Sequence, residues 1–205
     1  MAMAVAAASR PKALDRSITT VILVKLFSFV NGLPDQMSTT QNTVYLMISG
    51  AITAYRAPEF VAALSQRFKR VLTVQTPNAM RLISPRELVR IPNNQVVESY
   101  FDERILPRPT PGPVVFAPCN FNSLNKLAHG IADNLALSIT AEMIGFGQPV
   151  VVALSLNAPL WNHPQAKASV ATLRSWGVQV VEPQDLGEGP IMAPTDVVVA
   201  ALGDV

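Results

Sequence analysis

The chain has 205 residues, of which 49% are hydrophobic and 15% are charged, and its formal net charge is +2. This length suits one domain with a substantial core, and the small net charge points neither to nucleic acid nor to a membrane surface. Two histidines and a single cysteine exclude a disulfide framework and argue against a His/Cys metal site. We therefore predict a cytoplasmic protein without a metal. The low charge content favours a homo-oligomer, the alternative being one large core.

Residues 1–36 precede the first convincing strand. Ile18 to Val30 form an apolar run behind basic residues, but Lys25 interrupts the run, which is also too short to span a bilayer. We expect 1–36 to be a flexible or mis-annotated N-terminal extension, the alternative being an interaction arm. Residues 37–205 then form the folded domain.

From residue 37 onward, short apolar strands alternate with helical patterns. Strands are predicted at 44–48, 71–74, 114–116, 150–153 and 178–181. Helices are predicted at 52–68, 78–88 (divided by Pro85), 121–131, 134–145, 164–176 and 194–202. The proline-rich stretch 91–113 is predicted to be a loop. This alternation predicts a flavodoxin-like or Rossmann-like α/β fold, with a mostly parallel sheet and helices on both faces.

Small and polar residues follow the first two strands. Gly50, Ala51 and Ile52 lie where a helix begins, and the free N–H groups of a helix start suit a phosphate. One glycine after a strand is common, so an ordinary turn is the alternative. Thr76 follows the second strand, where its hydroxyl can face a ligand or simply cap a helix.

A denser polar cluster follows the third strand. Asn120, Asn122 and Ser123 offer amide and hydroxyl groups that can bind the edge of a heterocycle in the crevice beyond the strands. The alternative is simple capping of the next helix. Cys119 lies in the same turn, and a single thiol is more often a small buried residue than a nucleophile.

The fourth strand is followed by Ser155 and Asn157. The amide hydrogens of Asn157 can hold a substrate carboxylate or thiol, and Trp161 can form a pocket wall. A capping asparagine and a core tryptophan are the alternatives. We expect both histidines, His129 and His163, to be structural.

Taken in order, these motifs resemble the homo-oligomeric flavin-containing cysteine decarboxylase family. That family includes phosphopantothenoylcysteine decarboxylases and the peptidyl-cysteine decarboxylases of epidermin-type peptide biosynthesis. The similarity covers about residues 43–200. Residues 118–123 align with the motif Pro-Ala-Ser-Ala-Asn-Thr, 126–134 keep Lys-Leu-Ala-x-Gly-x-x-Asp-Asn, and 154–161 align with Pro-x-Met-Asn-x-x-Met-Trp.

The resemblance implies FMN as the cofactor. Gly50, Ala51 and Ile52 would approach its phosphate, and Asn157 would grip the cysteine of the substrate. The residues that would line the flavin are Thr76, Asn120, Asn122, Ser123 and Ser155. Family members form trimers, sometimes assembled into dodecamers, with the flavin near subunit contacts, which implies a homo-oligomer here.

Two departures from the family pattern bear on the reaction. The family's active-site histidine is replaced by Arg104, which cannot act as a base at neutral pH because its pKa is above about 12. Asp102 or Glu103 can take that role only if burial raises the pKa of the carboxyl group. The substrate clamp of phosphopantothenoylcysteine decarboxylases carries a cysteine, whereas residues 183–190 are shorter and contain none.

Without the clamp cysteine, the resemblance favours a reaction that stops at the enethiol. We therefore predict FMN-dependent oxidative decarboxylation of the C-terminal cysteine of a peptide. Phosphopantothenoylcysteine decarboxylase is an alternative. A non-catalytic FMN-binding subunit with a regulatory or structural role in an oligomer is another, because the histidine is missing.

Overall fold

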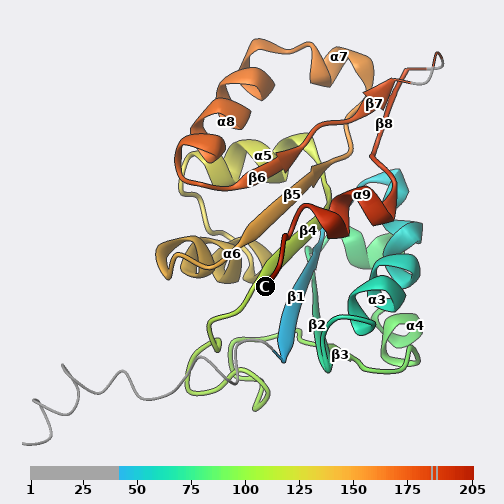
Figure 1. Ribbon diagram of the computed structural model, residues 1–205, viewed down its shortest axis with the longest axis vertical. Helices are drawn as coiled ribbons and strands as arrows, with labels where there is room; N and C mark the ends of the chain where they lie inside the picture. Colours follow the sequence, from blue (N-terminus) through green and yellow to red (C-terminus); the bar gives the residue numbers. More distant parts are fainter. Residues whose placement is uncertain (1–41, 186, 188) are drawn as a thin grey trace, which may run out of the picture. The chain divides into compact units, whose positions relative to one another are not determined.

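The computed structural model describes residues 42–185, 187 and 189–205, and Figure 1 shows how their helices and strands are arranged. The expectation for residues 1–36 lies outside this part of the chain. Within the described residues, no helix is long and apolar enough to cross a membrane.

Six strands form the central sheet, in the order β3-β2-β1-β4-β5-β6. Their bounds are β1 Thr43–Ile48, β2 Arg70–Gln75, β3 Asn94–Val96, β4 Val114–Cys119, β5 Val150–Leu154 and β6 Gln179–Val181. All five pairings are parallel, which confirms the predicted sheet. The chain passes from β1 outward to β2 and β3 and then returns to place β4 on the other side of β1. The boundary between β1 and β4 is therefore the topological switch point.

Helices cover both faces of the sheet (Figure 1). One face packs against α5, α6 and α8, and the other against α3, α4 and α9. The helical elements are η1 Ile52–Arg56, α3 Ala57–Ser65, η2 Ala79–Arg81, α4 Pro85–Val89, α5 Phe121–Ala128, α6 Leu135–Gly145, α7 Ala158–Trp161, α8 Pro164–Ser175 and α9 Thr195–Ala200.

The strands read as continuous apolar runs because both of their faces are buried. In β1, Tyr45 and Met47 belong to one hydrophobic core, whereas Val44, Leu46 and Ile48 belong to the other. All five side chains are fully buried. A parallel sheet covered on both sides requires this pattern, which is why strands were predictable from short apolar runs.

The predicted loop 91–113 is wrong at one point, since it contains β3. This three-residue edge strand is polar, and its Asn94 is buried by two side-chain hydrogen bonds. Thr73 Oγ1 donates to Asn94 Oδ1 at 2.6 Å, and Asn94 Nδ2 donates to the carbonyl of Leu88 at 2.9 Å. Tertiary partners therefore stabilise a strand that has no apolar pattern of its own.

The predicted helix 52–68 is also divided. It begins as the 3-10 helix η1 and becomes α-helical only at Ala57. Pro58 lies in the first turn of α3, where its missing N–H removes no α-helical hydrogen bond. Proline thus marks the point at which the α-helix begins.

A small antiparallel hairpin, absent from the predicted elements, follows β6. It consists of β7 Gln184–Asp185 and β8 Pro190–Ile191 and is not paired with the central sheet. The Asp185 carboxylate accepts hydrogen bonds from the backbone N–H groups of Gly187 and Gly189 at 2.9 and 3.2 Å. Both glycines have positive φ angles, 97° and 101°, which other residues rarely adopt.

Candidate functional site

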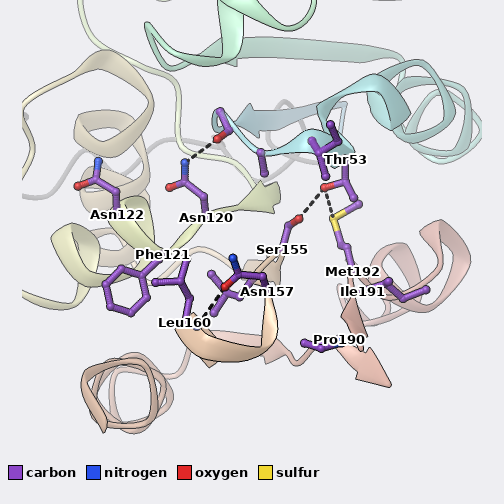
Figure 2. A pocket seen from close by; sticks show the side chains of 14 residues that line it. Thr53, Asn120, Phe121, Asn122, Ser155, Asn157, Leu160, Pro190, Ile191 and Met192 are labelled. Atoms are coloured by element: carbon purple, nitrogen blue, oxygen red, sulfur yellow. Dashed lines mark hydrogen bonds between the residues drawn. The ribbon is translucent and has the colours of Figure 1, made fainter. Parts of the chain in front are cut away.

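A cavity of about 550 Å³ opens at the carboxyl ends of β1, β4 and β5. It lies at the topological switch point, where open α/β sheets bind their ligands, and its size is typical of a cofactor site. Figure 2 shows the side chains that line it. They are Gly50, Ala51, Ile52, Thr53, Asn120, Phe121, Asn122, Ser155, Leu156, Asn157, Leu160, Pro190, Ile191 and Met192.

The floor of the cavity is held by hydrogen bonds between the ends of β1 and β4. Ser49 Oγ donates to the carbonyl of Pro118 at 2.8 Å and accepts from the backbone N–H of Asn120 at 2.8 Å. Asn120 Nδ2 then donates to the carbonyl of Gly50 at 3.0 Å. Ser49 was not singled out from the sequence, because nothing local indicates that a hydroxyl there spans two strands.

Gly50 is required by a close approach of the backbone. A Cβ at this position would lie 2.6 Å from the Cβ of Asn78 and 3.0 Å from its carbonyl carbon. The loop after β2 therefore packs directly on the turn after β1. This packing explains the glycine without any ligand, although the turn also leaves the start of η1 exposed to the cavity.

The first turn of η1 presents hydrogen-bond donors to the cavity. Its N-terminal N–H groups have no acceptor within the helix, no side chain caps them, and the first turn contains no acidic residue. Thr53 Oγ1 donates to Ser155 Oγ at 2.8 Å, which joins this turn to the loop after β5 (Figure 2). These donors favour an anion, and the first turn contains no acidic side chain that would repel it.

The cluster after β4 divides into structural and available groups. Asn120 is the N-cap of α5, since its Oδ1 accepts from the backbone N–H of Ser123 at 2.9 Å. Ser123 is buried and does not line the cavity. The exposed Asn122 lines it, and Figure 2 shows its amide without a hydrogen bond to the other residues drawn. Asn122 is therefore the residue of this cluster whose whole side chain is available to a ligand.

Asn157 combines a cap with a free amide. Its Oδ1 accepts from the backbone N–H of Leu160 at 3.1 Å and so caps α7. This bond fixes the side chain and leaves the amide nitrogen, directed away from the α7 turn in Figure 2, to donate into the cavity. Trp161 instead packs against the hydrophobic core and does not line the cavity.

Thr76 is likewise not brought into the cavity. It is buried at the end of β2, where its backbone N–H donates to the carbonyl of Ile48 at 2.9 Å and its carbonyl accepts from Ala79. Of the nine candidate residues named from the sequence, seven line one cavity, and Thr76 and Ser123 do not. Sequence reasoning missed Thr53 and Met192, which lie far apart along the chain.

Arg104, which the resemblance places where the family has its histidine, lies outside the cavity. Its carbonyl accepts from Arg70, the first residue of β2, and its Nη1 donates to the carbonyl of Val96 at 2.8 Å. Val96 pairs with Thr73 in the middle of β2, whereas the cavity opens beyond the carboxyl ends of β1, β4 and β5, and Arg104 is not among its lining residues. Arg104 therefore does not line the cavity of its own chain.

The alternative base is not supported at Asp102. Burial by itself would raise the pKa of its carboxyl group, but hydrogen bonds from the backbone and guanidinium of Arg104 outweigh it and lower the pKa below the usual value. The Arg104 Nε to Asp102 Oδ1 distance is 2.7 Å. A carboxylate that is stabilised in its charged form is a poor general base, so Asp102 does not meet the condition under which it could replace the histidine.

The thiol and the two imidazoles have structural positions. Cys119 is fully buried, and burial raises the pKa of its thiol well above the ordinary value, which keeps it protonated and unreactive. His163 caps α8 by accepting from the backbone N–H of Gln165 at 3.0 Å. His129 Nδ1 lies 2.7 Å from the carbonyl of Asn125. None of the three lines the cavity.

The chain matches the Flavoprotein family model over residues 33–204, and it belongs to that family. It is 27% identical to the probable phosphopantothenoylcysteine decarboxylase of Streptococcus mutans, over 79% of this chain and 92% of that protein. It is also 27% identical to the coenzyme A biosynthesis bifunctional protein CoaBC of Bacillus subtilis, over 76% of this chain but only 41% of that protein.

Among solved structures, the FMN-dependent cysteine decarboxylase SpaF superimposes with a TM-score of 0.67 at 26% identity, covering 80% of this chain and 96% of that one. The family and these neighbours establish the flavodoxin-like fold and FMN as the cofactor. The cavity fits this molecule in size, and its donors comprise amides, hydroxyls and the N–H groups of η1, with no acidic side chain among its lining residues.

Proposed function

We propose that the protein catalyses FMN-dependent oxidative decarboxylation of the C-terminal cysteine of a peptide. The observation that carries this proposal is the amide of Asn157, fixed by its cap on α7 and directed into the cavity. Two N–H groups in a fixed position suit a carboxylate or a thiol. FMN, when bound, would supply the oxidation that removes two electrons and two hydrogens from the cysteine residue, and loss of CO2 would then leave an enethiol.

We assign the phosphate and the flavin of FMN to different lining residues of the cavity. Gly50, Ala51 and Ile52 would lie beside the phosphate, although the Ala51 N–H itself donates to the carbonyl of Ser49 at 2.9 Å, and Asn122 and Ser155 would face the flavin. Asn120 would support the site mainly by holding the ends of β1 and β4 together. Thr53 would direct the Ser155 hydroxyl through their mutual hydrogen bond.

The uncharged walls favour a peptide over a phosphorylated substrate. None of the lining residues is Asp, Glu, Lys, Arg or His. The turn at Gly50, Ala51 and Ile52 is assigned to the FMN phosphate, so a second phosphate, on the substrate, would need a cation such as arginine, which the lining lacks. The exposed rim is instead apolar, with Ile52 81% exposed and Ile191 48% exposed. We therefore expect an uncharged, preferably apolar residue before the cysteine.

The hairpin provides a second argument about the product. In the family scheme, a clamp cysteine supplies a proton when the enethiol is reduced, and residues 183–190 contain no cysteine. The wall formed by Pro190 and Ile191 contributes no titratable group. The enethiol would therefore be released, and oxygen would regenerate the oxidised flavin.

Phosphopantothenoylcysteine decarboxylation is the second candidate, and the comparisons favour it. The Streptococcus mutans relative that carries this name is matched over nearly its whole length. The chain spans about two fifths of the Bacillus subtilis bifunctional protein, so the activities of that whole protein are not transferred here. Both candidates share decarboxylation of a cysteine carboxyl group and differ in the group attached to the cysteine.

We also propose that the working form is a homo-oligomer. Residue 104 does not line the cavity of its own chain, so a catalytic role for it would place it at the cavity of another copy. Arg104→His tests whether residue 104 acts in catalysis, and light scattering of the natural protein measures the oligomeric state. Activity that appears only in the histidine variant would indicate that the natural protein is a non-catalytic subunit, whereas an active natural protein would show that the histidine is dispensable.

The proposed function is tested with the full chain, FMN and two substrates in air. Mass spectrometry would follow a peptide with an apolar residue before a C-terminal cysteine, and phosphopantothenoylcysteine in parallel. Loss of CO2 and two hydrogens from the peptide supports the main proposal. Loss of CO2 alone from phosphopantothenoylcysteine favours the second candidate. A flavin-loaded protein that leaves both unchanged would reject an enzymatic role on either substrate.

A further inference from the structure

The cavity wall formed by the β7–β8 hairpin has little support from the central sheet. Each of the two strands has two residues, and neither is paired with the six-stranded sheet. An isolated hairpin of this size is not stable in water by itself. Yet Pro190 and Ile191 of β8, and Met192 directly after it, line the cavity. Their position must therefore be set by contacts elsewhere.

Arg56, the last residue of η1, provides the most extensive polar contact with the segment that leaves β8. Its Nη1 donates to the carbonyls of Met192 and Ala193 at 3.4 and 3.2 Å, and its Nη2 donates to Thr195 Oγ1 at 2.9 Å. Only 16% of the Arg56 side chain is exposed. A single guanidinium thus joins the end of η1 to a segment 136 residues later.

Glu59 completes this contact. Its Oε2 accepts from Arg56 Nε at 3.2 Å and from Thr195 Oγ1 at 3.1 Å. The guanidinium, the hydroxyl and the carboxylate therefore form a closed ring of hydrogen bonds, with the Arg56 guanidinium also 5.8 Å from the centre of the Phe60 ring. This closed set of hydrogen bonds restricts the guanidinium to one orientation, because each of the three groups is hydrogen-bonded to the other two.

The hydrogen bonds of Arg56 reach the cavity wall through Met192, which lines the cavity. Met192, whose carbonyl Arg56 holds, presents its sulfur 3.9 Å from Thr53 Oγ1, and Thr53 bonds Ser155 on the opposite side. Figure 2 shows Thr53, Ser155 and Met192 converging at this wall. The position of the Met192 backbone therefore determines how closely the hairpin wall approaches the rest of the cavity.

We propose that Arg56 is a positioning residue that fixes the hairpin wall of the cavity and thereby sets the affinity for the substrate; the substrate part rests on the proposed function. Arg56 is engaged with four acceptors in the protein and does not line the cavity, so it acts through the wall. Lysine cannot reproduce this arrangement fully, because it offers a single ammonium group where arginine offers a planar fork of five donors.

Arg67 supplies a matched control. Arg67 follows α3, and its guanidinium donates to the backbone carbonyls of Val199 and Gly203 near the C-terminus. It thus contacts α9 and the residues after it, and not the hairpin. Arg56→Met and Arg67→Met each remove one guanidinium with its carbonyl contacts. Only the first removes contacts to a residue that lines the cavity.

Backbone hydrogen exchange of Ile191, Met192 and Ala193 is the primary measurement, since it needs neither FMN nor substrate; Pro190 and Pro194 beside them have no backbone N–H. We expect Arg56→Met to accelerate this exchange at least about tenfold, Arg56→Lys to have an intermediate effect, and Arg67→Met to leave it unchanged. In turnover of the cysteine peptide, Arg56→Met should raise KM about tenfold, while kcat and the Kd for FMN stay within about threefold.

Equal exchange of residues 191–193 in Arg56→Met, Arg67→Met and the natural protein would overturn the proposal. Faster exchange with an unchanged KM would also reject the role in substrate affinity. If the natural protein turns over neither cysteine substrate, the proposed function fails. The exchange result still decides whether Arg56 holds the wall, so the two failures are distinguishable.

Discussion

The side-chain amide of Asn120 donates a hydrogen bond of 3.0 Å to the backbone carbonyl of Gly50. This bond crosses the topological switch point and joins the turn after β1 to the start of α5. Because Asn120 also caps α5, one side chain sets both the floor of the cavity and the direction of the helix beside it. The neighbouring Asn122 has no such structural bond within the cavity, so substitutions at the two positions should separate stability from cofactor binding.

Asn120→Ala should lower the free energy of unfolding by about 1–2 kcal/mol, because it removes a helix cap and the bond to Gly50. Asn122→Ala should leave stability unchanged but weaken FMN binding about fivefold to tenfold, the effect of one lost hydrogen bond. Urea unfolding of the apoprotein and titration by flavin fluorescence measure the two effects. Unchanged FMN affinity in Asn122→Ala would remove this residue from the proposed cofactor site.

Gly50→Ala should be strongly destabilising for a steric reason. The added Cβ would lie 2.6 Å from Asn78 Cβ and 3.0 Å from its carbonyl carbon, so the loop after β2 must shift. Overpacking of this kind costs about 1–3 kcal/mol. Asn78→Gly in the same chain should restore part of the stability, since it removes the closest atom. Gly50→Ala with a melting temperature equal to that of the natural protein would show that the close approach is not maintained.

Asn157→Asp should separate the cap of α7 from substrate binding. The carboxylate keeps an acceptor for the Leu160 N–H, whereas the two amide donors are lost and a negative charge faces the substrate carboxylate. Loss of a charge-assisted hydrogen bond, about 1.5–3 kcal/mol, together with repulsion should reduce kcat/KM more than about 100-fold. Bound FMN should be retained. Asn157→Ala should also abolish turnover and additionally lose the cap, at about 1 kcal/mol of stability.

Much of the fold follows from the sequence because the buried strands are continuous apolar runs. The cap residues Asn120 and Asn157 were also predictable, since the end of a buried strand and the start of a helix occur within a few residues of each other. Sequence position does not show which way a side chain points. Thr76 follows a strand as Asn120 does, but it is buried and does not face the cavity.

The remaining features depend on contacts between distant segments. β3 is stabilised by the bonds that Asn94 makes with Thr73 and Leu88, and no apolar pattern indicates it. Thr53 reaches Ser155 and Met192, which are 102 and 139 residues away along the chain. The separation of Arg104 from the cavity also required the structure, because the sequence places a residue in a loop without saying at which edge of the sheet that loop lies.

Tyr45 should make stability depend on alkaline pH. Its ring is fully buried, its hydroxyl donates to the carbonyl of Thr110 at 2.9 Å, and burial raises the pKa of Tyr45 to about 12. Because the pKa of Tyr45 is higher in the folded state, the protonated hydroxyl stabilises the fold. This stabilisation is complete below pH 10, the ordinary pKa of tyrosine in the unfolded chain, and it is lost as the pH rises toward 12. The loss is at most about 2.7 kcal/mol for a shift of two units.

Urea unfolding between pH 8 and pH 12 measures this dependence, with Tyr45→Phe as the test variant. Phenylalanine cannot ionise, so the variant should begin less stable by about 1 kcal/mol for the lost bond and then decline less steeply above pH 10. Tyr55→Phe is the control, because Tyr55 is 66% exposed. It should flatten the decline less than Tyr45→Phe, and an equal or larger effect would contradict the assignment to Tyr45.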